Sequence, residues 1–349
     1  MPEAERPPGA FSRPGAFQRI GQRIGPGIGR RLARACRRVA LVAVGLTVVA
    51  AAAGAVYEEW SRRRAWRLYP PPGELVRVDG RSFHLHCLGQ GSPTVILEAG
   101  LDRRGSLAWS TVQPEMAALT RVCAYDRAGI QWSEAGQEPR DAERIASDLH
   151  ALLEAAEVAP PYVLVGHSLG GPLSRVYAHR FPDEVMGFVW VDSSHPEQLQ
   201  RLPREVIAAR PEPRSRIAPR ISRAIGWTRL RGPRARDAGS AFAPTSVRGV
   251  VGEQRALEDV FAQAGGTGPF GGRPLVVLTA GTRPRPPERS EELHARLQEG
   301  WLALQVDLAT LSINSDHRVI AQASHYIQVD DPEAVVTAVE DVVAAVREG

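Results

Sequence analysis

The stretch that decides the fold is Tyr162-Val163-Leu164-Val165-Gly166-His167-Ser168-Leu169-Gly170-Gly171, near the middle of the 349-residue chain. Its first four residues are apolar and predict a buried strand, and the residues from Gly170 to Arg180 predict a helix. The pattern Gly-x-Ser-x-Gly lies at the turn between them. Glycines leave room on both sides of a strained serine, and the N-terminus of the following helix offers N–H groups to a developing oxyanion. The pattern therefore predicts a nucleophile at Ser168.

Strand-like and helix-like runs alternate on both sides of this stretch. Residues 75–78 and 82–88 predict a hairpin, because Asp79-Gly80 between them favours a tight turn. The other predicted strands are residues 94–97, 122–125, 162–165, 188–191, 275–278 and 319–321, and the predicted helices are residues 109–119, 142–156, 170–180 and 332–346. This alternation indicates an α/β fold with a mainly parallel sheet and helices on both of its faces.

The alternation fails between residues 194 and 272, a part rich in Pro, Gly and Arg. A structureless loop of that length does not fit a compact domain. We therefore expect residues 194–272 to form a cap inserted into an α/β core of residues 74–193 and 273–349. Residues 195–237 hold 11 Arg and 4 acidic residues. We interpret this excess of positive charge as a solvated face of the cap. The alternative is a surface that binds anionic lipid or an anionic substrate.

Three further stretches extend the pattern around Ser168. They are Leu97-Glu98-Ala99-Gly100-Leu101, Tyr125-Asp126-Arg127-Ala128-Gly129 and Ser324-His325-Tyr326-Ile327, after the third, fourth and last predicted strands. Together they resemble the α/β-hydrolase superfamily, in particular the capped branch of esterases and proline-iminopeptidase-like enzymes, over residues 74–347. The resemblance implies an oxyanion hole made by the backbone N–H groups of Leu169 and Leu101, with Asp102 as an alternative donor. Arg127 and its neighbours are expected to form a structural ion pair that pins the loop after the fourth strand.

A serine nucleophile needs a general base, which at neutral pH is normally histidine. Among nine histidines, only His325 follows the last predicted strand and precedes the last helix, where the superfamily places its base. Many relatives place the acid after the penultimate strand, but no carboxylate occurs in residues 278–283. The sequence therefore favours Asp192, at the end of the preceding strand, and leaves Glu288 as the alternative.

These residues predict a serine hydrolase that acts on a carboxylic ester, with a small ester or amide as substrate. An aminopeptidase-like amide hydrolase and a catalytically silent binding protein of the same fold remain alternatives.

All 43 basic residues are arginines, so a Ser–Lys dyad is excluded. Dehalogenase-like hydrolysis needs an aspartate where Ser168 stands. The chain has no zinc motif and no phosphate-binding loop, and we expect neither a cofactor nor a metal ion.

The N-terminal part has a different character. Residues 39–56 carry no charge, nine arginines precede them, and four more arginines lie among residues 62–67. We expect a basic disordered tail over residues 1–38, a transmembrane anchor over 39–57 and a linker over 58–73. The heavier positive side favours a single-pass topology with the catalytic domain outside the cytoplasm, and a cleaved signal peptide is the alternative. No nucleic-acid reader motif accompanies the basic segment, so we expect no nucleic-acid partner.

The chain has only three cysteines, Cys36, Cys87 and Cys123. Three cysteines cannot make a disulfide framework. Cys87 and Cys123 lie in strand-like runs, and we expect them to be small core residues, with a bridge between them as the less favoured alternative for an exported domain.

Overall fold

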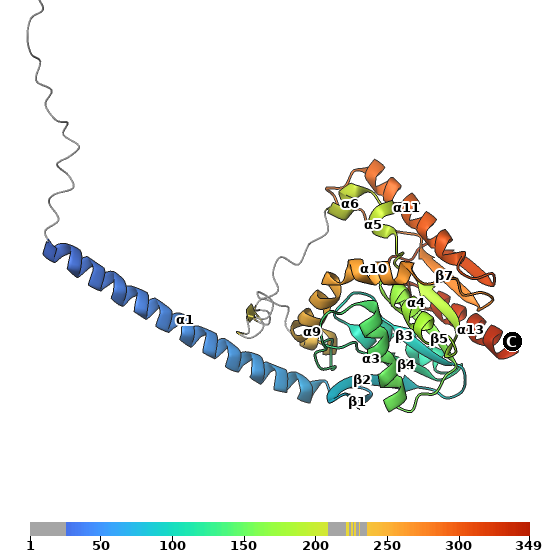
Figure 1. Ribbon diagram of the computed structural model, residues 1–349, viewed down its shortest axis with the longest axis horizontal. Coiled ribbons are helices and arrows are strands. Elements are labelled where there is room, and N and C mark those ends of the chain that lie inside the picture. Colours follow the sequence, from blue (N-terminus) through green and yellow to red (C-terminus); the bar gives the residue numbers. More distant parts are fainter. Residues whose placement is uncertain (1–25, 209–220, 223–224, 226, 228–229, 231–235) are drawn as a thin grey trace, which may run out of the picture.

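The computed structural model describes the chain except residues 1–25, 209–220, 223–224, 226, 228–229 and 231–235 (Figure 1). Its centre is one sheet of eight strands in the order β1-β2-β4-β3-β5-β6-β7-β8. The strands are β1 Glu74–Val78, β2 Arg81–Leu88, β3 Thr94–Glu98, β4 Val122–Tyr125, β5 Tyr162–His167, β6 Val185–Val191, β7 Leu275–Ala280 and β8 Ser315–Ile320. β2 runs antiparallel to β1 and β4, and the strands from β3 to β8 run parallel. The predicted α/β fold with a mainly parallel sheet is confirmed.

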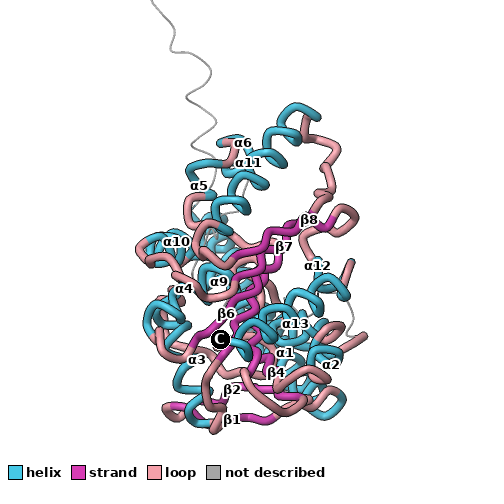
Figure 2. Tube along the Cα trace, turned by 90° about the vertical axis from the view of Figure 1, so that its right-hand side faces the viewer, coloured by secondary structure: helices cyan, strands magenta, loops and turns pink. Residues whose placement is uncertain are grey.

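Helices cover both faces of the sheet, as Figure 2 shows. On one face lie α3 (Ala142–Ala155), α4 (Gly170–Arg180) and α10 (Leu257–Gly265), whose apolar side chains share a core with Phe188 and Trp190 of β6. On the other face lie α2 (Gln113–Met116) and α13 (Pro332–Glu348). Strands buried on both faces are almost wholly apolar, which is why β5 and β7 read as continuous runs of hydrophobic residues.

Two predicted elements differ from the structure by four residues or more at one end. Residues 109–119 form no single helix, because the 3₁₀ turn η2 (Gly105–Trp109) precedes the short α2. The last strand begins at Ser315 rather than at residue 319. Its first residues are polar and largely exposed, since β8 is at the edge of the sheet and pairs with β7 only on one side. An edge strand of this kind lacks the apolar run by which the other strands were recognised.

The segment between β6 and β7 contains several helices on the carboxyl side of the strands. They are α5 (Gln198–Arg201), α6 (Arg204–Ala208), α9 (Ala238–Arg255) and α10. The capping box of Asp237 and Ser240 starts α9, the longest of them. Much of the arginine-rich part of the predicted cap lies outside the described residues. After β7, α11 (Glu291–Ala309) packs against α5, and α12 (Ile327–Asp330) follows the last strand.

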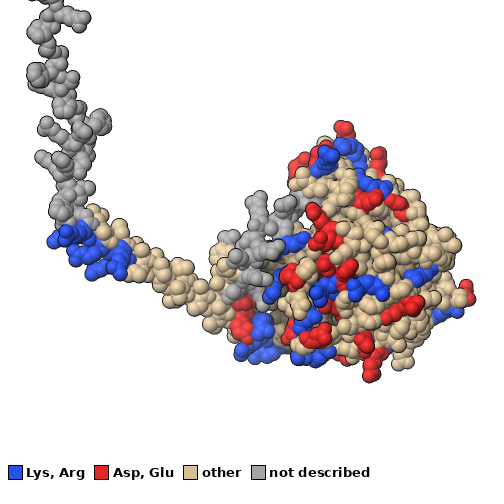
Figure 3. Space-filling view, in the orientation of Figure 1, with Lys and Arg blue, Asp and Glu red and all other residues tan. Residues whose placement is uncertain are grey.

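The N-terminal segment is one long helix, α1 (Pro26–Leu68). It is the one helix among the described residues that is long and apolar enough to cross a membrane. Figure 3 shows its uncharged middle between two arginine-bearing ends. Residues 26–38 of the expected disordered tail are helical instead, and residues 1–25 lie outside the described part. Alanine, leucine and arginine favour helix and extend it beyond the apolar run.

The expected linker over residues 58–73 is also mainly helical, because α1 continues to Leu68. Glu59 forms ion pairs with Arg62 and Arg63 one turn later. Trp66 packs edge-on against Phe242 of α9, with ring centroids 5.6 Å apart. The indole N–H of Trp132 donates to the carbonyl of Tyr69 at 3.0 Å. These contacts dock the end of α1 on the body, so it is no free linker.

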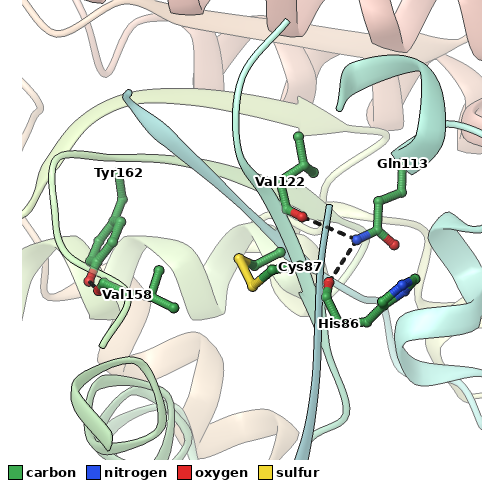
Figure 4. The surroundings of a disulfide bond; sticks show 7 residues. His86, Cys87, Gln113, Val122, Val158 and Tyr162 are labelled. Atoms are coloured by element: carbon green, nitrogen blue, oxygen red, sulfur yellow. Dashed lines mark hydrogen bonds between the residues drawn. A yellow bond between two sulfur atoms is a disulfide. The ribbon is translucent and has the colours of Figure 1, made fainter. Parts of the chain in front are cut away.

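Cys87 and Cys123 form a disulfide (Figure 4). The two residues face each other across the antiparallel pair β2 and β4. The expectation of two unbridged core cysteines was wrong, because it considered the strands one by one and the pairing of β2 with β4 puts the two side chains at the same position of the ladder. Cys36 on α1 is free and exposed.

Candidate active site

Ser168 lies on the turn between β5 and α4 with a backbone φ of +52°. Few non-glycine residues adopt this conformation, and it is costly unless the surroundings enforce it. The flanking glycines are required for space. A Cβ on Gly166 would lie 2.6 Å from the carbonyl carbon of Gly170, and a Cβ on Gly170 would lie 2.2 Å from the carbonyl oxygen of Glu98. The Gly-x-Ser-x-Gly pattern thus follows from the close approach of β5, α4 and β3.

His325 reaches Ser168 from the loop between β8 and α12. Its Nε2 lies 3.0 Å from the Ser168 Oγ. The backbone carbonyl of His325 accepts a hydrogen bond from the Nε2 of His167 at 2.8 Å, which fixes the loop beside the turn. One ring nitrogen of His325 thus faces the serine hydroxyl, the geometry that a general base requires.

Asp192 binds the other ring nitrogen of His325. Its Oδ2 lies 2.6 Å from the His325 Nδ1, and the aspartate is fully buried directly after β6. Burial alone would raise the pKa of Asp192, but hydrogen bonding to His325 and the charge of Arg283 hold the pKa below its ordinary value. Asp192 is therefore ionised at neutral pH. Glu288 is exposed and is not a partner of His325, whose Nδ1 is taken by Asp192.

Three donors besides His325 surround the carboxylate of Asp192. The Oδ1 accepts from the Trp301 indole at 2.8 Å and from the backbone N–H of Ala280 at 3.1 Å. The Oδ2 accepts from Arg283 at 2.7 Å, and this guanidinium lies 4.1 Å from the centroid of the Trp301 ring. Sequence reasoning missed both side chains. Arg283 lies within residues 278–283, which contain no carboxylate, and no sequence signal connects Trp301 of α11 to the site.

The loop after β3 passes close to Ser168. A Cβ on Gly100 would lie 3.1 Å from the Ser168 Cβ. The N–H of Asp102 is engaged, because it donates to the carbonyl of Gly100 at 3.0 Å. Within the described part of the chain, neither the N–H of Leu101 nor that of Leu169 donates a hydrogen bond. These two groups are thus available to an oxyanion, and the Asp102 N–H is not.

His167 precedes Ser168 in the chain and is buried. It is 1% exposed, and its ring centroid lies 4.7 Å from that of His325. Burial, together with the neighbouring His325, lowers the pKa of His167 to about 3. The His167 ring is therefore neutral at neutral and mildly acidic pH, and its Nε2–H donates to the His325 carbonyl.

We expect His167 to make the folded state sensitive to acid. Its pKa is about 3 in the fold and about 6.5 in an unfolded chain, so the unfolded state binds the additional proton between these values. The contribution is complete above pH 6.5 and is lost as the pH falls below it. Relative to His167→Gln, the wild type should lose about 2 kcal/mol more unfolding free energy between pH 6.5 and 5. Urea denaturation at the two pH values measures this, and equal losses would contradict it.

One cluster outside this site has the residue types of a metal site. His195, Glu197 and Asp307 place possible ligand atoms within 4.8 Å of one another. Arg201, however, forms ion pairs with both Glu197 and Asp307. The Nδ1 of His195 accepts the backbone N–H of Glu197 at 3.0 Å. The guanidinium of Arg201 already pairs with both carboxylates, so these side chains do not fit a metal ion.

Known proteins share this architecture. A family model described as alpha/beta hydrolase fold matches residues 86–221. The uncharacterized protein YqjL of Bacillus subtilis is 25% identical over 76% of this chain and 89% of its own length. Among solved structures, an esterase from Exiguobacterium antarcticum superposes with a TM-score of 0.58 at 15% identity, over 78% of this chain and 99% of the esterase.

A putative ancestral haloalkane dehalogenase superposes equally well, with a TM-score of 0.59 at 17% identity over 79% of this chain and all of its own. Likenesses at such low identity show the fold and leave the reaction open. The sheet order, the serine turn between β5 and α4, and the matching family model agree with one another. The chain therefore has the α/β-hydrolase fold, and its residues 86–221 match the family model of that fold.

Proposed function

We propose that the chain is a serine hydrolase that cleaves a carboxylic ester through an acyl-enzyme. The observation that carries the proposal is the continuous hydrogen-bonded series from Ser168 Oγ to His325 Nε2 and from His325 Nδ1 to Asp192 Oδ2. This constellation is recognised by its geometry and its roles, whatever the fold. A dehalogenase-type reaction is not supported, since the nucleophile position holds serine.

In the proposed mechanism, Ser168 Oγ attacks the ester carbonyl while His325 Nε2 takes the hydroxyl proton. The resulting oxyanion accepts hydrogen bonds from the N–H groups of Leu101 and Leu169. Collapse breaks the bond to the alcohol, which leaves with the proton from His325. Water then attacks the acyl-enzyme with the same histidine as base, and the acid is released. Asp192 keeps the Nδ1 proton in place and stabilises the imidazolium.

Ester substrates are favoured over peptides with a free N-terminus. An aminopeptidase-like site needs a carboxylate that can bind the substrate ammonium. Glu253, the buried carboxylate of α9, is paired with Arg127 through both of its oxygens. It is therefore not available to a substrate, which weighs against the amide hydrolase.

A position outside the cytoplasm, anchored by α1, is part of the same proposal. The apolar run of α1 is exposed, and arginines flank it on both sides. The Cys87–Cys123 disulfide supports this, because disulfides persist in oxidising compartments and are rare in the cytosol. Release after signal cleavage is the alternative, because Ala65 and Trp66, the residues of α1 that pack against α9, follow the apolar run and would remain in both cases.

Fluorophosphonate labelling of the full-length, detergent-solubilised chain tests the proposal, because the probe phosphonylates only an activated serine. We expect labelling of the wild type and of Ser110→Ala, whose serine is exposed and distant in sequence, and none of Ser168→Ala. A panel of ester and amide substrates then separates the two hydrolase classes. Labelling that survives in Ser168→Ala would reject the assigned nucleophile, and a folded wild type without labelling or turnover would favour a silent fold.

A further inference from the structure

Arg127, directly after β4, is buried and uses all five of its N–H donors. Two donors form a bidentate pair with Glu253 of α9, at 2.8 Å each. One binds Glu98 at the end of β3, at 2.6 Å. The last two bind the carbonyls of Ala99 and Gly100, at 2.6 and 2.7 Å. The expected structural ion pair is present, and it joins the loop after β4 to the loop after β3 and to α9.

The bond to the Gly100 carbonyl has a geometric consequence. The carbonyl of Gly100 and the N–H of Leu101 belong to one planar peptide unit and point in opposite directions. An arginine that fixes the carbonyl therefore fixes the direction of the Leu101 N–H, one of the two groups proposed to hold the oxyanion. The Asp102 N–H, which donates to the same carbonyl, adds to the restraint. The positive charge of Arg127 also polarises this peptide and strengthens its N–H as a donor.

The bond to Glu253 connects the same guanidinium to the segment between β6 and β7. Glu253 is fully buried near the end of α9 and is its only carboxylate. A bidentate carboxylate sets the plane of a guanidinium, so the place of α9 determines where the remaining three donors point. If α9 moved away, two buried donors of Arg127 would lose their partner, and the arginine would have to turn toward other acceptors.

We propose that Arg127 is a positioning residue for the oxyanion hole and that Glu253 makes its position depend on the docking of helix α9. The hole is complete only when α9 is docked through Glu253, so acyl transfer is favoured with α9 in this position. This inference rests on the proposed serine-hydrolase function, and it adds residues that touch no reacting atom. Among the described residues, they connect the cap to the oxyanion donor through direct hydrogen bonds.

The variant that tests it is Glu253→Gln, which keeps the shape of the side chain and removes one acceptor. We expect kcat to fall about tenfold, less than the loss from deleting an oxyanion donor outright, because the N–H is misaimed and not removed. KM for the same ester should stay within about twofold. The affinity for a trifluoromethyl ketone analogue, whose hemiketal oxyanion occupies the hole, should fall by the same factor as kcat/KM. The control is Glu258→Gln, at an exposed carboxylate of α10.

A merely structural role would lower the melting temperature of Glu253→Gln and leave kcat and ketone affinity of the folded enzyme unchanged, which would overturn the proposal. If Glu253→Gln shows no unfolding transition, Glu253→Asp gives the same comparison, since it keeps the charge and shortens the reach. Failure of the proposed serine-hydrolase function can be told apart from failure of this inference. In the former case the wild type itself would show no turnover that depends on Ser168.

Discussion

Ser168→Ala and His325→Ala are each expected to lower kcat by about 10⁶-fold, and the double variant should be no slower than either single one. The hydroxyl of Ser168 lies 3.0 Å from His325 Nε2, so the proposed nucleophile and the proposed base would act on one proton in one step. Removing either group removes that step entirely. Steady-state rates of the three full-length variants on one activated ester measure the effect.

The oxyanion donors remain in all three variants, because they are backbone groups of Leu101 and Leu169. A residual rate about 10³-fold above the uncatalysed reaction is therefore expected. Losses that multiply in the double variant would mean that Ser168 and His325 act independently. In that case the 3.0 Å contact would not describe the catalytic pair.

The turn around Ser168 could be predicted because its signals are local. A strand, a glycine-flanked serine and a helix follow one another within the stretch from Tyr162 to Arg180. The glycines are required because a Cβ at either position would lie too close to neighbouring backbone atoms. His325 was found by its position in the order of elements, after the last strand. Both inferences need only the chain order and the chemistry of single residues.

The acid was harder to predict because two positions offer a carboxylate. Asp192 directly follows the strand β6, while Glu288 follows the stretch after β7. What favours Asp192 in the structure is its three-dimensional neighbourhood. The donors of Arg283, Trp301 and the Ala280 backbone converge on Asp192 from β7, α11 and the loop between them. No spacing rule connects these residues.

Contacts between distant segments explain the other omissions. Arg127 was assigned to a structural pair, but its partner Glu253 lies 126 residues further along the chain. The pairing of Cys87 with Cys123 depends on the antiparallel contact of β2 with β4. The helix α1 was recognised by its apolar run, yet its length beyond that run follows from helix propensity and from docking on α9. Each of these features requires the packed structure to be known.

Asp192→Asn is expected to lower kcat by about 10⁴-fold with little effect on the fold. In the wild type, all four neighbours of the carboxylate are donors: His325 and Arg283 at Oδ2, Trp301 and the Ala280 N–H at Oδ1. An amide has only one oxygen, so its NH2 group must face donors on one side or the other. If the NH2 group faces His325, the Nδ1 must accept, the Nε2 carries the proton, and the ring cannot take a proton from Ser168.

In the other orientation the NH2 group faces the Trp301 indole and the Ala280 N–H, which leaves buried donors without an acceptor at a cost of about 1–3 kcal/mol. The charge of Arg283 favours the oxygen beside His325, but that orientation leaves both the Trp301 indole and the Ala280 N–H without an acceptor. With the NH2 group beside His325 only Arg283 loses its acceptor, because the His325 ring can change tautomer, so the population with the productive tautomer is small. Glu288→Gln is the matched control, since that carboxylate is exposed, and it should retain activity within about twofold. If Asp192→Asn keeps wild-type turnover while Glu288→Gln loses it, the acid is Glu288, and the contact between Asp192 and His325 is structural.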